Sequence, residues 1–187
     1  IANSNYILKT KDRTTNCVNY DTVIVMVQNI VLSGTAVRQD LFCFNDNSGK
    51  VKINANGGYR PYRYWTSGKV AQADSVVTGL AAGLNMYYFE DAKGCEFNDT
   101  FSLKEPPKLT LTLTAKKNLK CYNENIGEIE VIATGGSGGN KYKWSRSSDT
   151  LAKAINLASG LHTVTVVDKN GCLANLSETL TQPNEIS

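Results

Sequence analysis

The sequence is poor in the features that mark membrane-spanning and exported precursor chains. Its longest strongly apolar run, residues 22–27, is far shorter than the roughly 20 residues that a membrane-spanning helix needs. No basic stretch followed by an apolar segment opens the chain, whose first residue is Ile1 rather than Met. We therefore expect no membrane insertion. We expect a signal peptide either to have been removed already or never to have belonged to this piece, and we interpret the chain as a fragment.

The chain also lacks a charge of one sign and the usual groupings of reactive side chains. Its 20 lysines and arginines against 17 acidic residues leave a net charge of +3 without a basic stripe, so nucleic acid is not an expected partner. Neither a nucleophile elbow, a phosphate-binding loop, a paired-histidine metal motif nor a Cys-x-x-Cys motif occurs. His162 is the single histidine and is read as a polar residue at the start of a strand. The sequence predicts neither an enzyme nor a cofactor.

Strand-forming residues dominate what is present. Thr, Val, Ile and Tyr are frequent, glycine occurs 15 times, and no long stretch repeats its apolar residues with the helical period near 3.6. The chain is predicted to be all-β.

Two segments of the sequence repeat each other. CFNDNSGKVKINANGG begins at Cys43 and CYNENIGEIEVIATGG begins at Cys121. The match continues in the same order through Trp65 and Trp144, Leu-Ala-Ala-Gly and Leu-Ala-Ser-Gly, Asp-Ala-Lys-Gly-Cys and Asp-Lys-Asn-Gly-Cys, and Pro106 and Pro183. Such self-similarity is typical of tandem structural repeats. It divides the chain into units at 30–107 and 108–187, preceded at 1–29 by the last two strands of a truncated upstream unit.

Alternating residues and turn signals place the strands of each unit. We expect a third strand with Tyr62, Tyr64 and Trp65, and further strands at Val31–Val37, Lys50–Asn56, Leu84–Glu90 and Glu96–Leu103, with copies at Leu109–Ala115, Glu128–Thr134, Leu161–Val167 and Leu173–Leu180. About seven short strands in 78 residues, with a tryptophan on the third, predict tandem immunoglobulin-like β-sandwich repeats.

The order of these motifs resembles the SprB-type repeat. The shared features are Cys-aromatic-Asn, Gly-Gly, Tyr-x-Trp, Leu-x-x-Gly, Asp-x-x-Gly-Cys and, at the end of the second copy, Gln-Pro. The first copy departs from Tyr-x-Trp because Tyr64 and Trp65 are adjacent, so that they would point to opposite faces of the strand unless a bulge intervenes. The resemblance implies a repeat of very large surface proteins of Bacteroidota, among them gliding-motility adhesins exported by the type IX secretion system, and hence an extracellular location on the cell surface. The leading piece, residues 1–29, is similar to the close of a PKD-like or related Ig-like unit. The family usually has a tyrosine where this chain has Asn85 and His162, so a tyrosine-corner hydrogen bond is not expected.

The five cysteines fit an exported, oxidised protein. The favoured pairs lie within units, Cys43–Cys95 and Cys121–Cys172, and leave Cys17 unpaired. The corresponding turns lie at opposite poles of a seven-strand sandwich, however, so a bond between neighbouring units, Cys43–Cys172, stays open as the alternative.

Two ligand hypotheses arise from the turns and the aromatic residues. Asn45-x-Asn47-x-Gly49, repeated from Asn123 to Gly127, spaces side-chain oxygens like a calcium loop, but it lacks the closing acidic ligand and favours an Asx turn. An aromatic platform for sugars is predicted less strongly than a buried shared tryptophan with additional surface tyrosines. Its candidate residues are Tyr59, Tyr62, Tyr64 and Trp65.

The resemblance also implies a modification. Surface proteins of Bacteroidota carry O-glycans at Asp-Ser/Thr before an apolar residue, and this pattern occurs at Thr22, Ser75 and Thr150. We expect at least one of them to be modified.

Two functions from different classes follow. The first is a structural stalk segment of a large adhesin, whose partners are the neighbouring repeats of the same chain. The second is a carbohydrate-binding or adhesive accessory module of a secreted protein. Surface glycans and the secretion or motility machinery are the further partners that the resemblance implies.

Overall fold

The computed structural model describes residues 2–27 and 31–186, and within them it contains strands and turns without a helix. The prediction of an all-β chain is confirmed. Accordingly, no helix that could cross a membrane occurs among the described residues.

The first two strands form a hairpin of their own. β1 (Ala2–Lys11) pairs antiparallel with β2 (Val18–Val27), and the turn between them carries Cys17. The hairpin exposes large apolar side chains, among them Tyr6, Ile7 and Ile24. An isolated two-stranded sheet is at best marginally stable in water, because it buries little apolar surface. A second sheet packed against the hairpin, as in a sandwich, would cover these side chains.

Residues 33–103 form what we call the first sandwich, in which two three-stranded sheets face each other. One sheet has the order β3-β4-β6 and the other β5-β7-β8. The bounds are β3 (Ser33–Gln39), β4 (Gly49–Asn56), β5 (Arg63–Thr66), β6 (Val76–Leu80), β7 (Gly83–Glu90) and β8 (Glu96–Leu103). All pairings are antiparallel.

Residues 110–180 form the second sandwich, with the same topology. Its sheets have the orders β9-β10-β12 and β11-β13-β14. The bounds are β9 (Thr110–Lys117), β10 (Gly127–Thr134), β11 (Lys141–Trp144), β12 (Lys153–Leu157), β13 (Gly160–Val167) and β14 (Leu173–Leu180). Each sandwich therefore has six strands rather than the seven expected, and one of the six, β6 or β12, was not foreseen as a strand.

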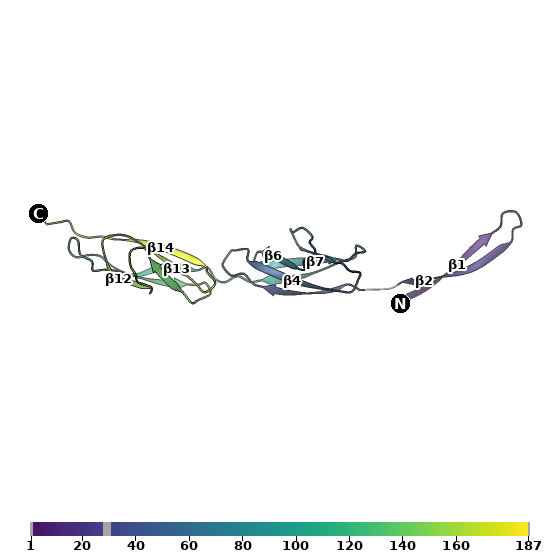
Figure 1. The fold of residues 1–187 in the computed structure, drawn as a ribbon, viewed down its shortest axis with the longest axis horizontal. Coiled ribbons are helices and arrows are strands. Elements are labelled where there is room, and N and C mark those ends of the chain that lie inside the picture. Colours follow the sequence, from purple (N-terminus) through teal and green to yellow (C-terminus); the bar gives the residue numbers. More distant parts are fainter. Residues whose placement is uncertain (1, 28–30, 187) are drawn as a thin grey trace.

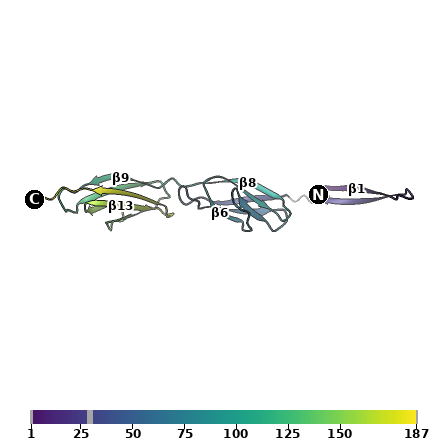
Figure 2. The same cartoon turned by 90° about the horizontal axis from the view of Figure 1, so that it is seen from above.

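The two sandwiches follow one another along the long axis of the molecule. Figures 1 and 2 show them end to end in two perpendicular views, each with its strands running roughly along that axis. Successive strands therefore turn at one of two poles of a sandwich, and the pole where a sandwich ends faces the pole where the next begins.

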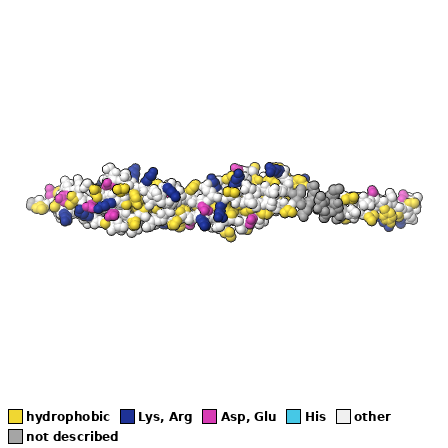
Figure 3. All heavy atoms as spheres, turned by 90° about the horizontal axis from the view of Figure 1, so that it is seen from below, with side chains coloured by type: hydrophobic (Ala, Val, Ile, Leu, Met, Phe, Trp, Pro, Cys, Tyr) yellow, Lys and Arg dark blue, Asp and Glu magenta, His cyan; other side chains and the backbone are white. Residues whose placement is uncertain are grey.

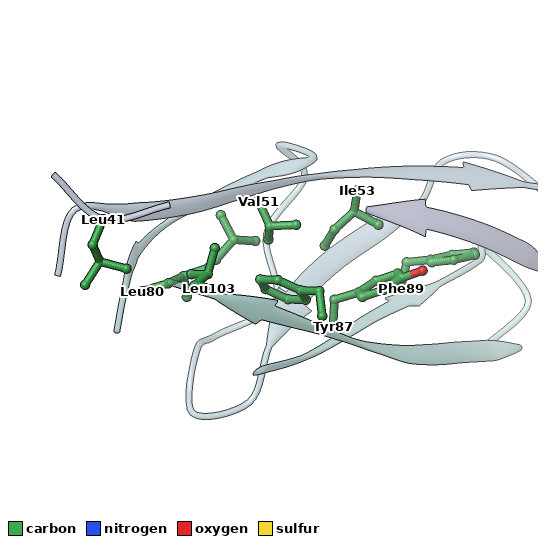
Figure 4. Close-up of a cluster of buried hydrophobic side chains, with 9 residues drawn as sticks. Leu41, Val51, Ile53, Leu80, Tyr87, Phe89 and Leu103 are labelled. Atoms are coloured by element: carbon green, nitrogen blue, oxygen red, sulfur yellow. The ribbon is translucent and has the colours of Figure 1, made fainter. Parts of the chain in front are cut away.

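Alternation along the strands builds the core of each sandwich. In the first sandwich the inward-facing side chains meet between the two sheets, as Figure 4 shows for Val51 and Ile53 on β4 and for Tyr87 and Phe89 on β7. In the second sandwich Ile129 and Val131 on β10 hold the corresponding positions. The expected inward faces of these two strands are confirmed.

The two tryptophans do not occupy equivalent positions, which corrects the expectation of a shared core tryptophan. Trp144 is 4% exposed and pairs across the sheet with Val164. In the first sandwich the same register position is held by the buried Thr66, opposite Tyr87. Each pair combines one large and one small side chain, so the core is filled in both sandwiches. The large side chain lies on β7 in the first sandwich and on β11 in the second.

Trp65 points to the opposite face from the core because it precedes Thr66 by one residue. It is half-buried and stacks on Tyr88, with ring centroids 5.4 Å apart and an interplanar angle of 2°. Tyr62 and Tyr64 pack against the core instead, next to Phe89. The expectation that these two tyrosines lie on the surface is therefore wrong.

Candidate functional site

The candidate functional site is the junction where the first sandwich meets the second. Three loops of the second sandwich reach it: the segment that enters β9, the Gly-Gly turn after β10 and the turn between β13 and β14. From the first sandwich the loop between β3 and β4, residues 40–48, reaches the same place.

A glycine pair shapes the turn after β10. Gly135 and Gly136 both have positive φ, 76° and 63°, a region that side chains with a Cβ rarely adopt. A Cβ on Gly135 would lie 2.0 Å from the carbonyl oxygen of Lys108. Only glycine lets the turn approach the segment entering β9 so closely. Gly57 and Gly58 repeat this arrangement in the first sandwich.

A buried carboxylate holds the turn between β13 and β14. Asp168 accepts hydrogen bonds from the backbone N–H groups of Ser137 (2.8 Å), Asn170 (2.9 Å) and Cys172 (2.9 Å). Burial, the largest single influence on this carboxyl, raises its pKa, but the backbone donors together outweigh burial and lower the pKa of Asp168. We call this arrangement the aspartate cradle; it fixes Cys172 beside the Gly-Gly turn.

The loop between β3 and β4 presents Cys43 to the cradle. Asp46 accepts hydrogen bonds from the backbone N–H of Cys43 (3.0 Å) and from the backbone N–H and hydroxyl of Ser48 (3.0 and 2.7 Å). Asn45 has a positive φ of 54°. The expected Asx-type turn thus forms on Asp46 rather than on Asn45 or Asn47. Among the described residues, no group of three or more His, Cys, Asp or Glu side chains is placed to hold a metal ion.

A disulfide joins the two sandwiches. Cys43 and Cys172 are bonded, with their Cα atoms 5.6 Å apart. Beside the bond, the Asn170 side-chain amide donates to the carbonyl oxygen of Phe42 (3.2 Å) and to the Ser137 hydroxyl (2.9 Å). The junction is otherwise open, since Phe42 and Phe44 stay 47% and 46% exposed.

The bond corrects the pairing expected within units, Cys43–Cys95 and Cys121–Cys172, and agrees with the alternative between neighbours. Cys43 lies at the pole where the first sandwich ends, whereas Cys95 lies in the turn between β7 and β8 at the opposite pole. Two cysteines can be bridged only when their Cα atoms lie within about 7 Å of each other. Cys17, Cys95 and Cys121 are exposed free thiols in the described structure.

Asn85 and His162 take over the hydrogen bond of the missing tyrosine. The Asn85 side-chain amide donates to the carbonyl oxygen of Ala81 (3.2 Å), and Nε2 of His162 lies 2.9 Å from the carbonyl oxygen of Ala158. The two bonds close equivalent turns, between β6 and β7 in the first sandwich and between β12 and β13 in the second. The buried His162 thus has a hydrogen-bond partner in the backbone. The tyrosine hydroxyl of the family is absent, as expected, but Asn85 and His162 each make a side-chain hydrogen bond to the backbone in its place.

The aromatic residues proposed as a sugar platform do not share one surface. Tyr62 and Tyr64 face the core of the first sandwich, Trp65 faces away from it, and Tyr59 is exposed in the turn after β4. Charged side chains of both signs intersperse with apolar ones along the face shown in Figure 3.

The three proposed glycosylation residues differ in accessibility. Thr22 is exposed in the middle of β2 rather than at its entry, and Thr150 is exposed in the connection between β11 and β12. Ser75 is half-buried beside β6, and its carbonyl oxygen accepts a hydrogen bond from the backbone N–H of Ile53.

Comparisons with solved structures return matches at low similarity. A C-terminal 282-residue fragment of intimin, in complex with the intimin-binding domain of the translocated intimin receptor, is 9% identical over 82% of this chain and 64% of its own, with a TM-score of 0.39. A structure described for Dscam isoform specificity is 12% identical over 96% of this chain and 54% of its own, with a TM-score of 0.36. The chain thus spans less than two thirds of either. No curated protein matches the chain.

The family comparison matches one segment in each sandwich. The model of the SprB repeat covers residues 35–70, from β3 past β5, and residues 113–149, from β9 past β11. These segments contain Cys43, Cys121 and the Gly-Gly turns, the same features on which the sequence resemblance rests. Each of the two β-sandwiches therefore contains one segment that matches the SprB repeat.

Proposed function

We propose that the chain is a stalk segment of a large cell-surface adhesin, which holds an adhesive region away from the cell. The observation that carries the proposal is the junction: one sandwich ends where the next begins, and the Cys43–Cys172 disulfide fixes the two poles together. A tandem array in which each repeat contacts mainly its neighbours grows in length with every copy. The proposal includes secretion to the cell exterior and a place in surface attachment or gliding motility.

The proposed units are residues 30–107 and 108–187, preceded at 1–29 by the last two strands of another repeat. The hairpin supports this division because its turn repeats the other two cysteine turns. The backbone N–H of Asp12 donates to the carbonyl oxygen of Cys17 at 2.9 Å, and Asp91 with Cys95 and Asp168 with Cys172 do the same at 3.0 Å.

Small-angle scattering tests the stalk directly. The oxidised chain should give the pair-distance distribution of a rod, with one cross-sectional maximum and a long tail. A distribution typical of a compact sphere would contradict the proposal. The Cys43→Ser, Cys172→Ser variant serves as the control, because a junction without the disulfide should broaden the tail while the cross-section stays the same.

The second candidate function is sugar binding by a surface-exposed aromatic pair. Trp65 and Tyr88 stack on the outer face of β5 and β7 and are half-buried, so part of each ring surface is accessible. A glycan array with the intact chain and with Trp65→Ala distinguishes the two functions. Binding that Trp65→Ala abolishes would favour the accessory module, whereas no binding by the intact chain favours the stalk.

We also propose O-glycosylation at Thr22, Ser75 and Thr150, with Thr150 the preferred site because it is exposed in a connection between strands. Mass spectrometry of material from the native host should show a glycan mass on the peptide that contains Thr150. An unmodified mass for all three peptides would refute the proposal.

A further inference from the structure

The three exposed thiols occupy the same positions as the two cysteines that are bonded. Cys121 follows β9 in the second sandwich as Cys43 follows β3 in the first, and Cys95 lies between β7 and β8 as Cys172 lies between β13 and β14. The bond therefore joins the first cysteine of one repeat to the second cysteine of the next.

The aspartate cradle that holds Cys172 is already built around the unbonded Cys95. Asp91 accepts hydrogen bonds from the backbone N–H groups of Tyr59 (2.9 Å), Lys93 (2.8 Å) and Cys95 (3.0 Å). The donors come from the same turns as in the second sandwich, and their hydrogen bonds, that of Tyr59 above all, lower the pKa of Asp91. Cys95 is thus held at the outer pole in the arrangement that makes a disulfide elsewhere in the molecule.

The loop that presents Cys43 is likewise repeated around Cys121. Glu124 accepts a hydrogen bond from the backbone N–H of Cys121 (3.2 Å), in the role of Asp46. Asn123 has a positive φ of 59°, and its backbone N–H donates to the Gln182 side chain (3.1 Å), as Asn45 donates to Glu105 (2.6 Å). Each end of the two-repeat segment therefore presents one half of the junction seen between the sandwiches.

We propose that Cys121 and Cys95 are half-sites for further SprB repeats, so that every junction of the array carries one disulfide. Cys121 takes the second cysteine of the following repeat, and Cys95 takes the first cysteine of the preceding one. Cys17, in the hairpin turn, bonds in the same way one repeat further upstream. The inference rests on the proposed tandem array, and its partner is another copy of the same fold.

The reaction is ordinary thiol–disulfide exchange with an oxidising disulfide. The thiolate of one cysteine attacks the oxidant to give a mixed disulfide, and the second thiolate displaces the oxidant from it. One S–S bond forms between the repeats, and the oxidant takes up two electrons and two protons to become two thiols.

Extended chains test the pairing. One variant consists of residues 1–184 followed by a second copy of residues 108–187, and the other of residues 1–184 followed by a copy of residues 31–107. Both are refolded in a mixture of reduced and oxidised glutathione, and disulfides are mapped by mass spectrometry of unreduced peptides. We expect Cys121 bonded to the copied Cys172 in the first variant and to the copied Cys95 in the second. The native Cys43–Cys172 bond in the same map shows that the original part has folded.

The thiol count gives an independent measure. Each new junction consumes two thiols, so the first variant should retain three free thiols, as the 187-residue chain does. Cys17→Ser in that variant should lower the count by one and leave the new bond unchanged. A free Cys121 in both variants, or Cys121 bonded to Cys172 of its own repeat, would overturn the inference. If the new bond is absent but scattering still shows a rod, the disulfide inference is wrong and the proposed stalk function stands. If the new bond forms but scattering shows a compact particle, the stalk function is wrong and the disulfide inference stands.

Discussion

Two buried hydroxyls distinguish the core of the first sandwich at the scale of single residues. Thr66 Oγ1 and the Tyr87 hydroxyl are buried and have no hydrogen-bond partner among the described residues. They belong to the cross-strand pair that replaces Trp144 and Val164. A buried polar atom without a partner costs folding free energy, whereas an apolar group of the same shape does not.

Thr66→Val should therefore stabilise the first sandwich, because it replaces the unpaired hydroxyl with a methyl group of similar size. We expect the free energy of unfolding to rise by about 1 kcal/mol, measured by urea denaturation. Thr35→Val makes the same atomic change where the hydroxyl accepts a hydrogen bond from Asn54 (3.3 Å) on the exposed face. That control should be neutral or slightly destabilising, and equal stabilisation of both variants would contradict the explanation.

Glu128 predicts how the second sandwich responds to acid. Its carboxylate bridges the side-chain amines of Lys117 on β9 (2.9 Å) and Lys153 on β12 (2.8 Å), and these hydrogen bonds lower the pKa of Glu128 from 4.5 to about 2. A lowered pKa means that the ionised form stabilises the fold. The contribution is fully present above pH 4.5 and is lost as the pH falls towards 2.

Urea denaturation of the second sandwich between pH 2 and pH 7 should show this loss, and Glu128→Gln should flatten the acid part of the profile. Glu96→Gln removes an exposed carboxylate from the first sandwich and should leave that part of the profile unchanged. A profile of Glu128→Gln that is parallel to the wild type would refute the assignment.

At the scale of elements, the hairpins were predictable, whereas the short strands β6 and β12 were not. The expected bounds of β8 and β14 agree with the structure, because each strand begins directly after an Asp-led turn with glycine in the left-handed region. β6 and β12 escape such reasoning since each contains a residue with positive φ, Gly79 or Asn156. The register of both strands also shifts, which breaks the period of two.

The tryptophan register could not be read from aligned letters for a related reason. Trp65 matches Trp144 in the sequence, but strand pairing places Thr66 at the position of Trp144. A displacement of one residue moves a side chain to the other face of a sheet. The smaller Thr66 is compensated by the larger Tyr87 on the neighbouring strand β7, where the second sandwich has Val164 on β13. This compensation depends on the pairing of strands and is not visible in the sequence alone.

The pair of Trp144 on β11 and Val164 on β13 fills the core of the second sandwich. Trp144→Thr should destabilise the second sandwich by about 3–5 kcal/mol, because it empties a large volume in the core. Adding Val164→Tyr should recover part of the loss, since the first sandwich uses that combination. Trp65→Thr, on the outer face, should cost only about 1 kcal/mol. Urea denaturation of the three variants and the wild type checks this, and no recovery in the double variant would contradict the proposed equivalence.

At the scale of the whole molecule, the sequence established the candidate site only in part. Periodicity identified the repeats and the cysteine turns, and the pole argument kept the bond between neighbours open. The choice between the two pairings depends on which poles meet, and that follows from the stacking of whole sandwiches rather than from any local motif. The aspartate cradle was missed for the same reason, because Asp168 and Ser137 lie far apart in the sequence and meet only in the folded unit.

The disulfide couples the stability of the two repeats, because it links residues 129 positions apart. On the chain-entropy model a closed loop of this length stabilises the folded state by roughly 5 kcal/mol. Cys43→Ser combined with Cys172→Ser should therefore lower the summed free energy of unfolding by an amount of this order, and a reducing agent should have the same effect on the wild type. Denaturation with and without reductant measures it. Cys121→Ser removes a free thiol and should leave the stability unchanged; an equal loss in that variant would show that the effect does not come from the junction.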